Sequence, residues 1–499
     1  MPEQALAGAP CPPYKAGMGR SRVKLYGFVV LCLFGTGACD GSEPAEPVAP
    51  VVVIGIDGLE PSLISELLEA GRLPNLAKFA EHGVLGRLES MIPTYSPVIW
   101  TSIATGQAPN AHGITFFHDE ENRPYTSNAR KVPALWNIAS DAGRTVNCVG
   151  WWNTWPAETI NGKMLSTYAA QAQASVIWKP GVWENLEELT WPPNLMDEIQ
   201  SEMIFVSDAA RVRDILWQSF PEPRDQDPST EQRDISEVMT KSVTDLGWSL
   251  SADLSSTAVA IRLQEQYPAD LSMVYLSMPD VAGHRFWSYH EPEFYNFELK
   301  EPAKTDFAEY IRLAYVETDR QLGELLDSLP ANASVLVLSD HGMHAWEDSI
   351  DDPEAGSTGH HPAGPPGIFA ALGPLITNRG NLLGEQQKGD LGHVLEVAPL
   401  VLRMLGIAVP EHWPAMRGSL TLEQVLDERW RRAHPMARAE NTDGSYRPAT
   451  ASLLPTEDVD DQFRKVFSGL GYALGDEARE ESEKAFDEAR GEGEDLEHE

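Results

Sequence analysis

The chain has 499 residues, enough for one large α/β domain with insertions or for two domains. Its formal net charge is −37, from 38 Lys and Arg against 75 Asp and Glu, so the basic surface that a nucleic-acid binder needs is not provided. We therefore expect no DNA or RNA polymer as a partner. Cys148 is the one cysteine beyond the first 40 residues, so no disulfide is expected within the globular part.

The N-terminal residues 1–38 are predicted to be a signal peptide, with Met18 as an alternative start. A basic segment precedes the apolar stretch 25–38, which is too short for a comfortable transmembrane helix. Small residues then lead to Cys39, which resembles the lipidated first residue of a bacterial lipoprotein; a plain secretory signal is the alternative. Residues 39–50, rich in Pro and acidic residues, are predicted to be a disordered tether. Both alternatives place the protein outside the bacterial cytoplasm, and the first anchors it to a membrane through Cys39.

Short apolar runs alternate with segments of helical periodicity along most of the chain. Five of these runs are predicted to be buried strands, and the first of them, 51–56, is rich in β-branched residues. The alternation predicts a mostly parallel sheet with helices on both faces. The predicted strands are 51–56, 144–149, 273–277, 334–339 and 367–372. The predicted helices include 61–83 with an interruption at Pro74, 96–106, 307–329 and 393–405.

Two segments depart from this alternation within or after a catalytic domain predicted over 51–425. Residues 151–267 are rich in Trp, Pro and acidic residues, and we predict an insertion that forms a cap over the sheet. Its residues Trp151, Trp152 and Trp155 are expected to pack in the core or the cap. Residues 426–499 are predicted to be a polar extension that ends in an acidic tail.

Three aspartates come just after predicted strands, where ligands bind in open α/β sheets. They are Asp57, Asp280 and Asp340. Three carboxylates at one edge of a sheet repel one another strongly unless cations separate them, so we expect bound metal. Histidines accompany them, and mixed Asp and His ligation suits Zn²⁺, with Mn²⁺ or Fe²⁺ as alternatives.

The histidines lie close to these aspartates in the sequence. His284 is four residues after Asp280, so one helical turn places both side chains on one face. His341 directly follows Asp340. His360 and His361 compete for one further ligand position, and the spacing after Gly359 favours His361. We expect His112 to be a structural turn residue and His344 and His393 to be surface residues.

A hydroxyl-bearing segment, Pro93-Thr-Tyr-Ser-Pro97, lies near Asp57 in the sequence. Ser96 is a candidate nucleophile, and Thr94 is its nearest aliphatic rival. Taken alone, Ser96 could equally be the N-cap of a helix that starts at Pro97.

The motifs together resemble those of the type I phosphodiesterase/nucleotide pyrophosphatase family, within the alkaline phosphatase superfamily. The resemblance covers roughly residues 50–425 and implies a three-layer α/β sandwich around a mostly parallel sheet. It depends on the order of the motifs more than on any one of them. They are Gly55-Ile-Asp57-Gly, Pro93-Thr-Tyr-Ser96, Ala104-Thr-Gly106, Asn110-Ala-His112-Gly, Pro279-Asp280-Val-Ala-Gly-His284, Ser339-Asp340-His341-Gly and Gly359-His360-His361.

The resemblance implies a hydrolase of small phosphorylated substrates, a phosphodiesterase or phosphomonoesterase, with a serine nucleophile and two zinc ions. By position, the nucleophile maps to Ser96, which would also touch one of the zinc ions. That zinc would be held by Asp57, Asp340 and His341, and the other by Asp280, His284 and His361.

Several alternatives stay open. The family nucleophile is usually Thr followed closely by an Asn that contacts phosphate; Ser96 and Ile99 stand at these positions, which leaves the choice between monoester and diester open. Sulfatase chemistry is disfavoured, because Pro97 directly follows Ser96 and no Arg follows nearby. A phospho-group transferase or phosphonate hydrolase on the same scaffold is one alternative function. A non-catalytic, metal-binding surface lipoprotein is the other.

Overall fold

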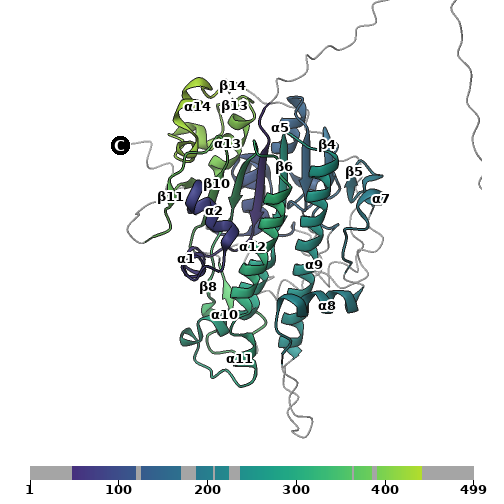
Figure 1. Cartoon of the computed structure of the whole chain (residues 1–499), viewed down its shortest axis with the longest axis vertical. Helices are drawn as coiled ribbons and strands as arrows, with labels where there is room; N and C mark the ends of the chain where they lie inside the picture. The colour runs from purple at the N-terminus through teal and green to yellow at the C-terminus, as the bar shows by residue number, and fades with distance from the viewer. Residues whose placement is uncertain are drawn as a thin grey trace, which may run out of the picture. The chain divides into compact units, whose positions relative to one another are not determined.

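A computed structural model describes residues 48–119, 125–169, 187–205, 208–223, 237–353, 355–361, 365–384 and 390–440 (Figure 1). The predicted signal peptide, Cys39, most of the predicted tether and the acidic tail lie outside these ranges. None of the helices within them is both long and apolar enough to cross a lipid bilayer.

A ten-stranded sheet lies at the centre of the described structure. Its strands follow the order β11-β2-β10-β7-β1-β6-β3-β4-β5, with β12 beside β2. The strands of this sheet are β1 (Val51–Ile56), β2 (Val84–Glu89), β3 (Val146–Val149), β4 (Gly162–Leu165), β5 (Thr190–Trp191), β6 (Leu271–Leu276), β7 (Ser334–Leu338), β10 (Gly367–Leu372), β11 (Gly380–Asn381) and β12 (Gly392–His393). Two short pairs lie apart from it: β8 (His344–Ala345) with β9 (Gly359–His360), and β13 (Val409–Pro410) with β14 (Arg438–Ala439).

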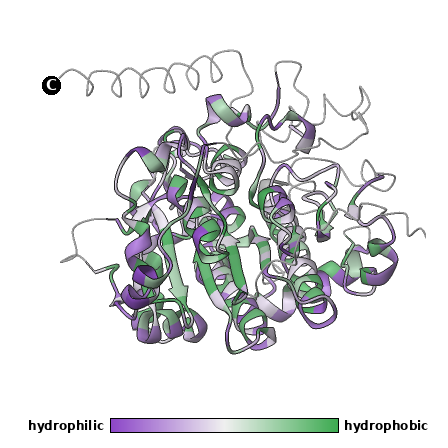
Figure 2. Ribbon diagram, turned by 90° about the horizontal axis from the view of Figure 1, so that it is seen from above, coloured by the Kyte–Doolittle hydropathy of each residue, from purple (hydrophilic) through white to green (hydrophobic). Residues whose placement is uncertain are grey.

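Helices cover both faces of the sheet, and Figure 2 shows apolar strands lying between them. The side chains of β1 explain why: Val51 and Val53 belong to one buried cluster, and Val52, Ile54 and Ile56 to the other. Because both faces are buried, the strand is apolar throughout. One cluster includes α3 (Ser96–Thr105), α5 (Leu135–Asp141) and α13 (Val397–Met404). The other includes α1 (Pro61–Glu69), α2 (Pro74–His82), α8 (Ala209–Ser219), α9 (Glu237–Gln266), α10 (Met278–His290) and α12 (Tyr310–Ser328).

The predicted α/β class with a mostly parallel sheet and helices on both faces is confirmed. Two strands make the sheet mixed: β10 runs antiparallel to both of its neighbours, β2 and β7, and the edge strand β5 runs antiparallel to β4. The remaining helices are short: α4 (Pro109–His112), α7 (Leu195–Ile199), α11 (Ala303–Phe307) and α14 (Glu428–Ala433).

Within residues 151–267, the part that the structure describes extends the sheet through β4 and β5, and α9 packs on one face. The cap predicted for this segment stays a prediction. Trp151 and Trp155 are at most 1% exposed and lie in the core, as expected. The composition suggested a cap because the strands are short and Trp, Pro and acidic residues surround them.

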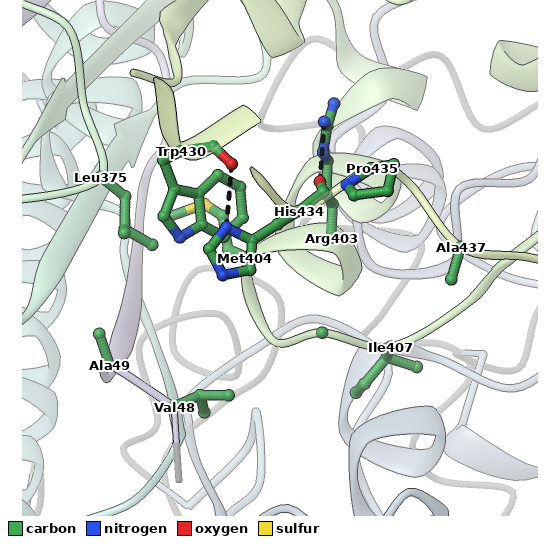
Figure 3. Close-up of a pocket in the computed structure, with 11 residues that line it drawn as sticks. Val48, Ala49, Leu375, Arg403, Met404, Ile407, Trp430, His434, Pro435 and Ala437 are labelled. Carbon is green, nitrogen blue, oxygen red and sulfur yellow. Dashed lines mark hydrogen bonds between the residues drawn. The ribbon is translucent and has the colours of Figure 1, made fainter. Parts of the chain in front are cut away.

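A cavity of about 330 Å³ lies beside the amino-terminal end of β1, where Val48 and Ala49 line it (Figure 3). On its far side the rings of Trp430 and His434 are stacked, with centroids 4.6 Å apart. The predicted metal ligands follow the opposite, carboxyl ends of the strands, so this cavity is not part of their site.

Candidate metal centre

Three adjacent parallel strands bring the predicted aspartates together. Strands β7, β1 and β6 lie side by side with their carboxyl ends at one edge of the sheet. Asp57 directly follows β1, and Asp340 follows β7 by two residues. Asp280 lies in the first turn of α10, the helix that follows β6. The order of the strands therefore explains why residues that are remote in the sequence share one site.

Asp57, Asp340 and His341 form the first group of candidate ligands, and each is at most 1% exposed. The Nε2 atom of His341 lies 3.2 Å from Oδ1 of Asp57 and 3.4 Å from Oδ2 of Asp340. These three residues are the set that the sequence predicts for one cation.

Asp280, His284 and His361 form the second predicted set, and they also lie together. Oδ1 of Asp280 is 3.5 Å from Nε2 of His284 and 3.8 Å from Nε2 of His361. The two Nε2 atoms are 3.1 Å apart. The rings of His361 and His341 stack with centroids 3.6 Å apart, so the two sets are in direct contact.

Hydrogen bonds at Nδ1 orient two of the histidines. Nδ1 of His341 lies 2.9 Å from the carbonyl oxygen of Gly342, and Nδ1 of His284 lies 2.8 Å from that of Gly359. Because a carbonyl oxygen can only accept, each Nδ1 carries a proton and each Nε2 faces the cluster, where it would offer its lone pair to a bound cation. This is the arrangement that metal-binding histidines usually have.

The two candidate hydroxyls differ in their surroundings. Thr94 donates its proton to the carbonyl oxygen of His361, and its Oγ1 lies 3.3 Å from Nδ1 of the same residue. Ser96 places its Oγ 3.4 Å from Nε2 of His341. Tyr95 is the N-cap of α3 and Ser96 is the first helical residue, so the N-cap role considered for Ser96 is wrong.

The carboxylates and histidines shift one another's pKa values. Burial raises the pKa of Asp280 and of Asp340 well above the ordinary range, and the charge of Asp57 adds to this effect. Burial opposes protonation of His341, but Asp340, Asp57 and Asp280 together raise its pKa to about 10. Burial also raises the pKa of Asp57, but the hydrogen bond and charge of His341 outweigh it, so the net shift is downward. When no cation is bound, the carboxylates thus favour a proton at Nε2 of His341, the atom that faces both Asp57 and Asp340.

These residues fit divalent cations. Oδ1 of Asp280 and both carboxylate oxygens of Asp340 are buried and accept no hydrogen bond from any residue that the structure describes. Buried oxygens of this kind are costly unless they are paired or bind metal. Oxygen and imidazole nitrogen ligands suit Zn²⁺ and related ions.

Two neighbours of Asp57 were not predicted from the sequence. Its Oδ2 accepts hydrogen bonds from Nε1 of Trp100, at 3.0 Å, and from the hydroxyl of Tyr275. Burial raises the pKa of Tyr275 well above its ordinary value, and the charge of Asp57 raises it further, so the hydroxyl keeps its proton. In the sequence both residues look like ordinary core aromatics.

The other histidines have mixed positions. His360 also offers a nitrogen near His284 and His361, so the preference for His361 stays a prediction. His344 pairs with His360 across the β8–β9 ladder, and His393 accepts a hydrogen bond from the amide of Leu395; both are partly buried rather than fully exposed.

His112 is buried and has the structural surroundings expected for it. Its Nδ1 accepts from the amide of Ile114 at 3.1 Å, so its Nε2 carries the proton and donates to Oγ of Ser102 at 2.8 Å. Burial, with the charge of Arg130, lowers the pKa of His112 to about 3. The folded protein therefore keeps this ring neutral.

This shift predicts a loss of stability in acid. The unfolded chain binds a proton at residue 112 below about pH 6.5, whereas the folded chain does so only near pH 3. The neutral His112 therefore contributes its full share to the free energy of unfolding above pH 6.5. This contribution falls as the pH drops, by up to about 1.4 kcal/mol per pH unit. The free energy of unfolding, measured by urea denaturation, should fall between pH 7 and pH 5. This fall should be about 2 kcal/mol smaller in His112→Asn than in the wild-type protein. Equal losses would contradict this prediction, and His82→Asn, at an exposed position, is the control.

Comparison with known proteins agrees with the motifs. Residues 51–356 match the family model described as type I phosphodiesterase/nucleotide pyrophosphatase, which is more than half of the chain. Murine ectonucleotide pyrophosphatase/phosphodiesterase 5 is 12% identical, with a TM-score of 0.44 over 76% of this chain and 100% of that one. Phosphonoacetate hydrolase from Sinorhizobium meliloti is 17% identical, with a TM-score of 0.37 over 61% of this chain and 59% of that one.

A putative sulfatase from Bacteroides thetaiotaomicron is 12% identical, with a TM-score of 0.43 over 77% of this chain and 76% of that one. The extent of the family match, and not these distant structural likenesses, decides the family. The chain belongs to the type I phosphodiesterase/nucleotide pyrophosphatase family and is an enzyme of that family.

Proposed function

We propose that the protein hydrolyses small phosphoric esters with Ser96 as the nucleophile and two divalent cations, zinc by preference. The observation that carries this proposal is the position of Ser96 Oγ, 3.4 Å from His341, which belongs to a cluster of Asp and His side chains that could hold metal ions. The family implies a phosphorylated small molecule as the substrate.

Asp57, Asp340 and His341 would hold one cation, and Asp280, His284 and His361 the other. When bound, such cations lower the pKa of a serine hydroxyl and offset the negative charge of a phosphoryl group. The proton of Thr94 is committed to the carbonyl oxygen of His361, which favours Ser96 over Thr94 as the nucleophile.

Ser96 begins α3, so the positive end of the helix dipole lies at its hydroxyl and favours the alkoxide. Ser96 Oγ loses its proton and bonds to phosphorus, the bond between phosphorus and the ester oxygen breaks, and the leaving oxygen takes up a proton to give the alcohol. Water afterwards cleaves the phosphoserine and restores the hydroxyl. Helix α3 thus positions the nucleophile, and the surrounding side chains determine the charge near the substrate.

Ile99 bears on the choice between monoester and diester. Its side chain is fully buried in the core cluster, so it offers no polar contact to a phosphate group. This supports a substrate preference different from that of a typical nucleotide diesterase, and we propose that the protein accepts monoesters.

The test is a paired assay with p-nitrophenyl phosphate and bis-p-nitrophenyl phosphate, each with and without a chelator. We expect release of p-nitrophenol that the chelator abolishes and added Zn²⁺ restores, faster with the monoester. Inactivity on both substrates with zinc bound would overturn the hydrolase proposal in favour of a metal-binding role. Transfer to an added alcohol in preference to water would instead identify a phospho-group transferase.

A further inference from the structure

The two carboxylate oxygens of Asp57 face different neighbours. Oδ1 lies 3.2 Å from Nε2 of His341, on the side of the candidate ligands. Oδ2 accepts from Nε1 of Trp100 at 3.0 Å and from the hydroxyl of Tyr275. Asp57, Trp100 and Tyr275 are each at most 4% exposed, so water does not compete for these hydrogen bonds.

The sequence builds this arrangement with a glycine and three aromatic rings. Tyr275 on β6 is in register with Gly55 on β1. A Cβ atom at Gly55 would lie 2.5 Å from the ring of Trp100, so only glycine lets this indole lie over the strand. The ring of Trp100 is perpendicular to those of Tyr275 and Trp151, each with its centroid 5.2 Å away. The donors that contact Asp57 are therefore held by packing.

The other two candidate aspartates have no such support. Oδ1 of Asp280, which is partly exposed, and both carboxylate oxygens of Asp340 accept no hydrogen bond from any described residue. Asp57 is therefore the one aspartate of the two sets that two described donors hold. A carboxylate held in one orientation loses less conformational freedom when it binds a cation.

We propose that Trp100 and Tyr275 are positioning residues for Asp57. By holding Oδ2 they turn Oδ1 toward Asp340 and His341, and so raise the cation affinity of this set over that of the set formed by Asp280, His284 and His361. Neither residue touches the cation or the substrate. The inference rests on the proposed function in that it takes these two sets as the cation sites.

The test compares Tyr275→Phe and Trp100→Phe with the wild-type protein. Metal-depleted protein is titrated with Zn²⁺ by calorimetry and with Co²⁺ by visible absorption. We expect one of the two cations to bind about 10–100-fold more weakly in each variant while the other keeps its affinity. We also expect turnover to recover toward the wild-type value as zinc is raised, because the reacting groups are intact.

Tyr310→Phe is the matched control, because its buried hydroxyl also donates to a single acceptor, the carbonyl oxygen of Pro221 at 2.5 Å. It should leave both affinities unchanged. If circular dichroism shows that one Asp57 neighbour variant is unfolded, the other decides the question.

Three results would overturn the inference. Wild-type affinity for both cations in Tyr275→Phe and Trp100→Phe would do so while the proposed function stands. An equal loss at both sites would show a general structural role and would also leave the function standing. If the wild-type protein binds no divalent cation, the proposed function fails, and the inference fails with it.

Discussion

Replacing Ser96 with alanine is expected to abolish turnover and to leave two divalent cations bound per chain. The substitution removes the hydroxyl that lies 3.4 Å from His341 but none of the six predicted Asp and His ligands. Loss of a nucleophile typically lowers kcat by on the order of 10⁴-fold or more. The measurements are the rate of p-nitrophenol release and the zinc content by atomic absorption.

Two further variants make this result specific. Ser96→Thr keeps a hydroxyl and should retain measurable activity. Thr94→Val removes the hydrogen bond to the carbonyl oxygen of His361. It should lower the rate of turnover by about 10–100-fold, as is usual for a residue that orients a ligand. Full activity of Ser96→Ala, together with an inactive Thr94→Val, would move the nucleophile to Thr94.

Replacing Asp340 with asparagine is expected to lower activity by about 10³-fold or more and to remove one of the two cations. Both carboxylate oxygens of Asp340 are buried without a hydrogen-bond donor among the described residues, so a cation is their natural partner. Cation content and kcat at saturating substrate measure the effect. Asp319→Asn is the control, because Asp319 is a buried carboxylate that accepts from the amides of Asn75 and Leu76 and should keep both cations.

The Asp340→Asn variant should be more stable than the wild-type protein when metal is absent. Burial, with the charge of Asp57, raises the pKa of Asp340, so the folded chain binds this proton more tightly than the unfolded chain. Metal-free wild-type protein therefore loses stability as the pH rises above about 4, and asparagine removes this loss. If chelated Asp340→Asn melts below chelated wild type at pH 7, repulsion at this site is not what destabilises the metal-free protein.

The sequence predicts the central strands well and the edge of the sheet poorly. Strand β1 is found as predicted because an apolar run of six residues is buried on both faces. Strand β2 was missed, since Gly86 and Arg87 interrupt its apolar pattern. Its pairing with the antiparallel β10 also depends on a partner that is remote in the chain.

The sequence also indicates some residues of the candidate site and misses others. Acidic and histidine side chains stand out when they follow a strand, so the residue pattern indicates Asp57, Asp340 and His341, and the family resemblance implies that they hold one cation. Trp100 and Tyr275 each contribute one polar atom on an aromatic ring that also fills the core, and no sequence pattern separates that use from simple packing. The choice between His360 and His361 stays a prediction for a related reason, since adjacent residues share nearly every local signal.

The adjacency of β7, β1 and β6 also determines when the metal centre can form. Val51 pairs with Leu271 and with Ser334, so each contact closes a loop of more than 200 residues. Closing such loops costs entropy before the contacts are made, which slows folding. The candidate site therefore cannot form until the chain is available as far as His361. A bound cation would then stabilise the completed sheet against global unfolding, because an unfolded chain holds no preformed site.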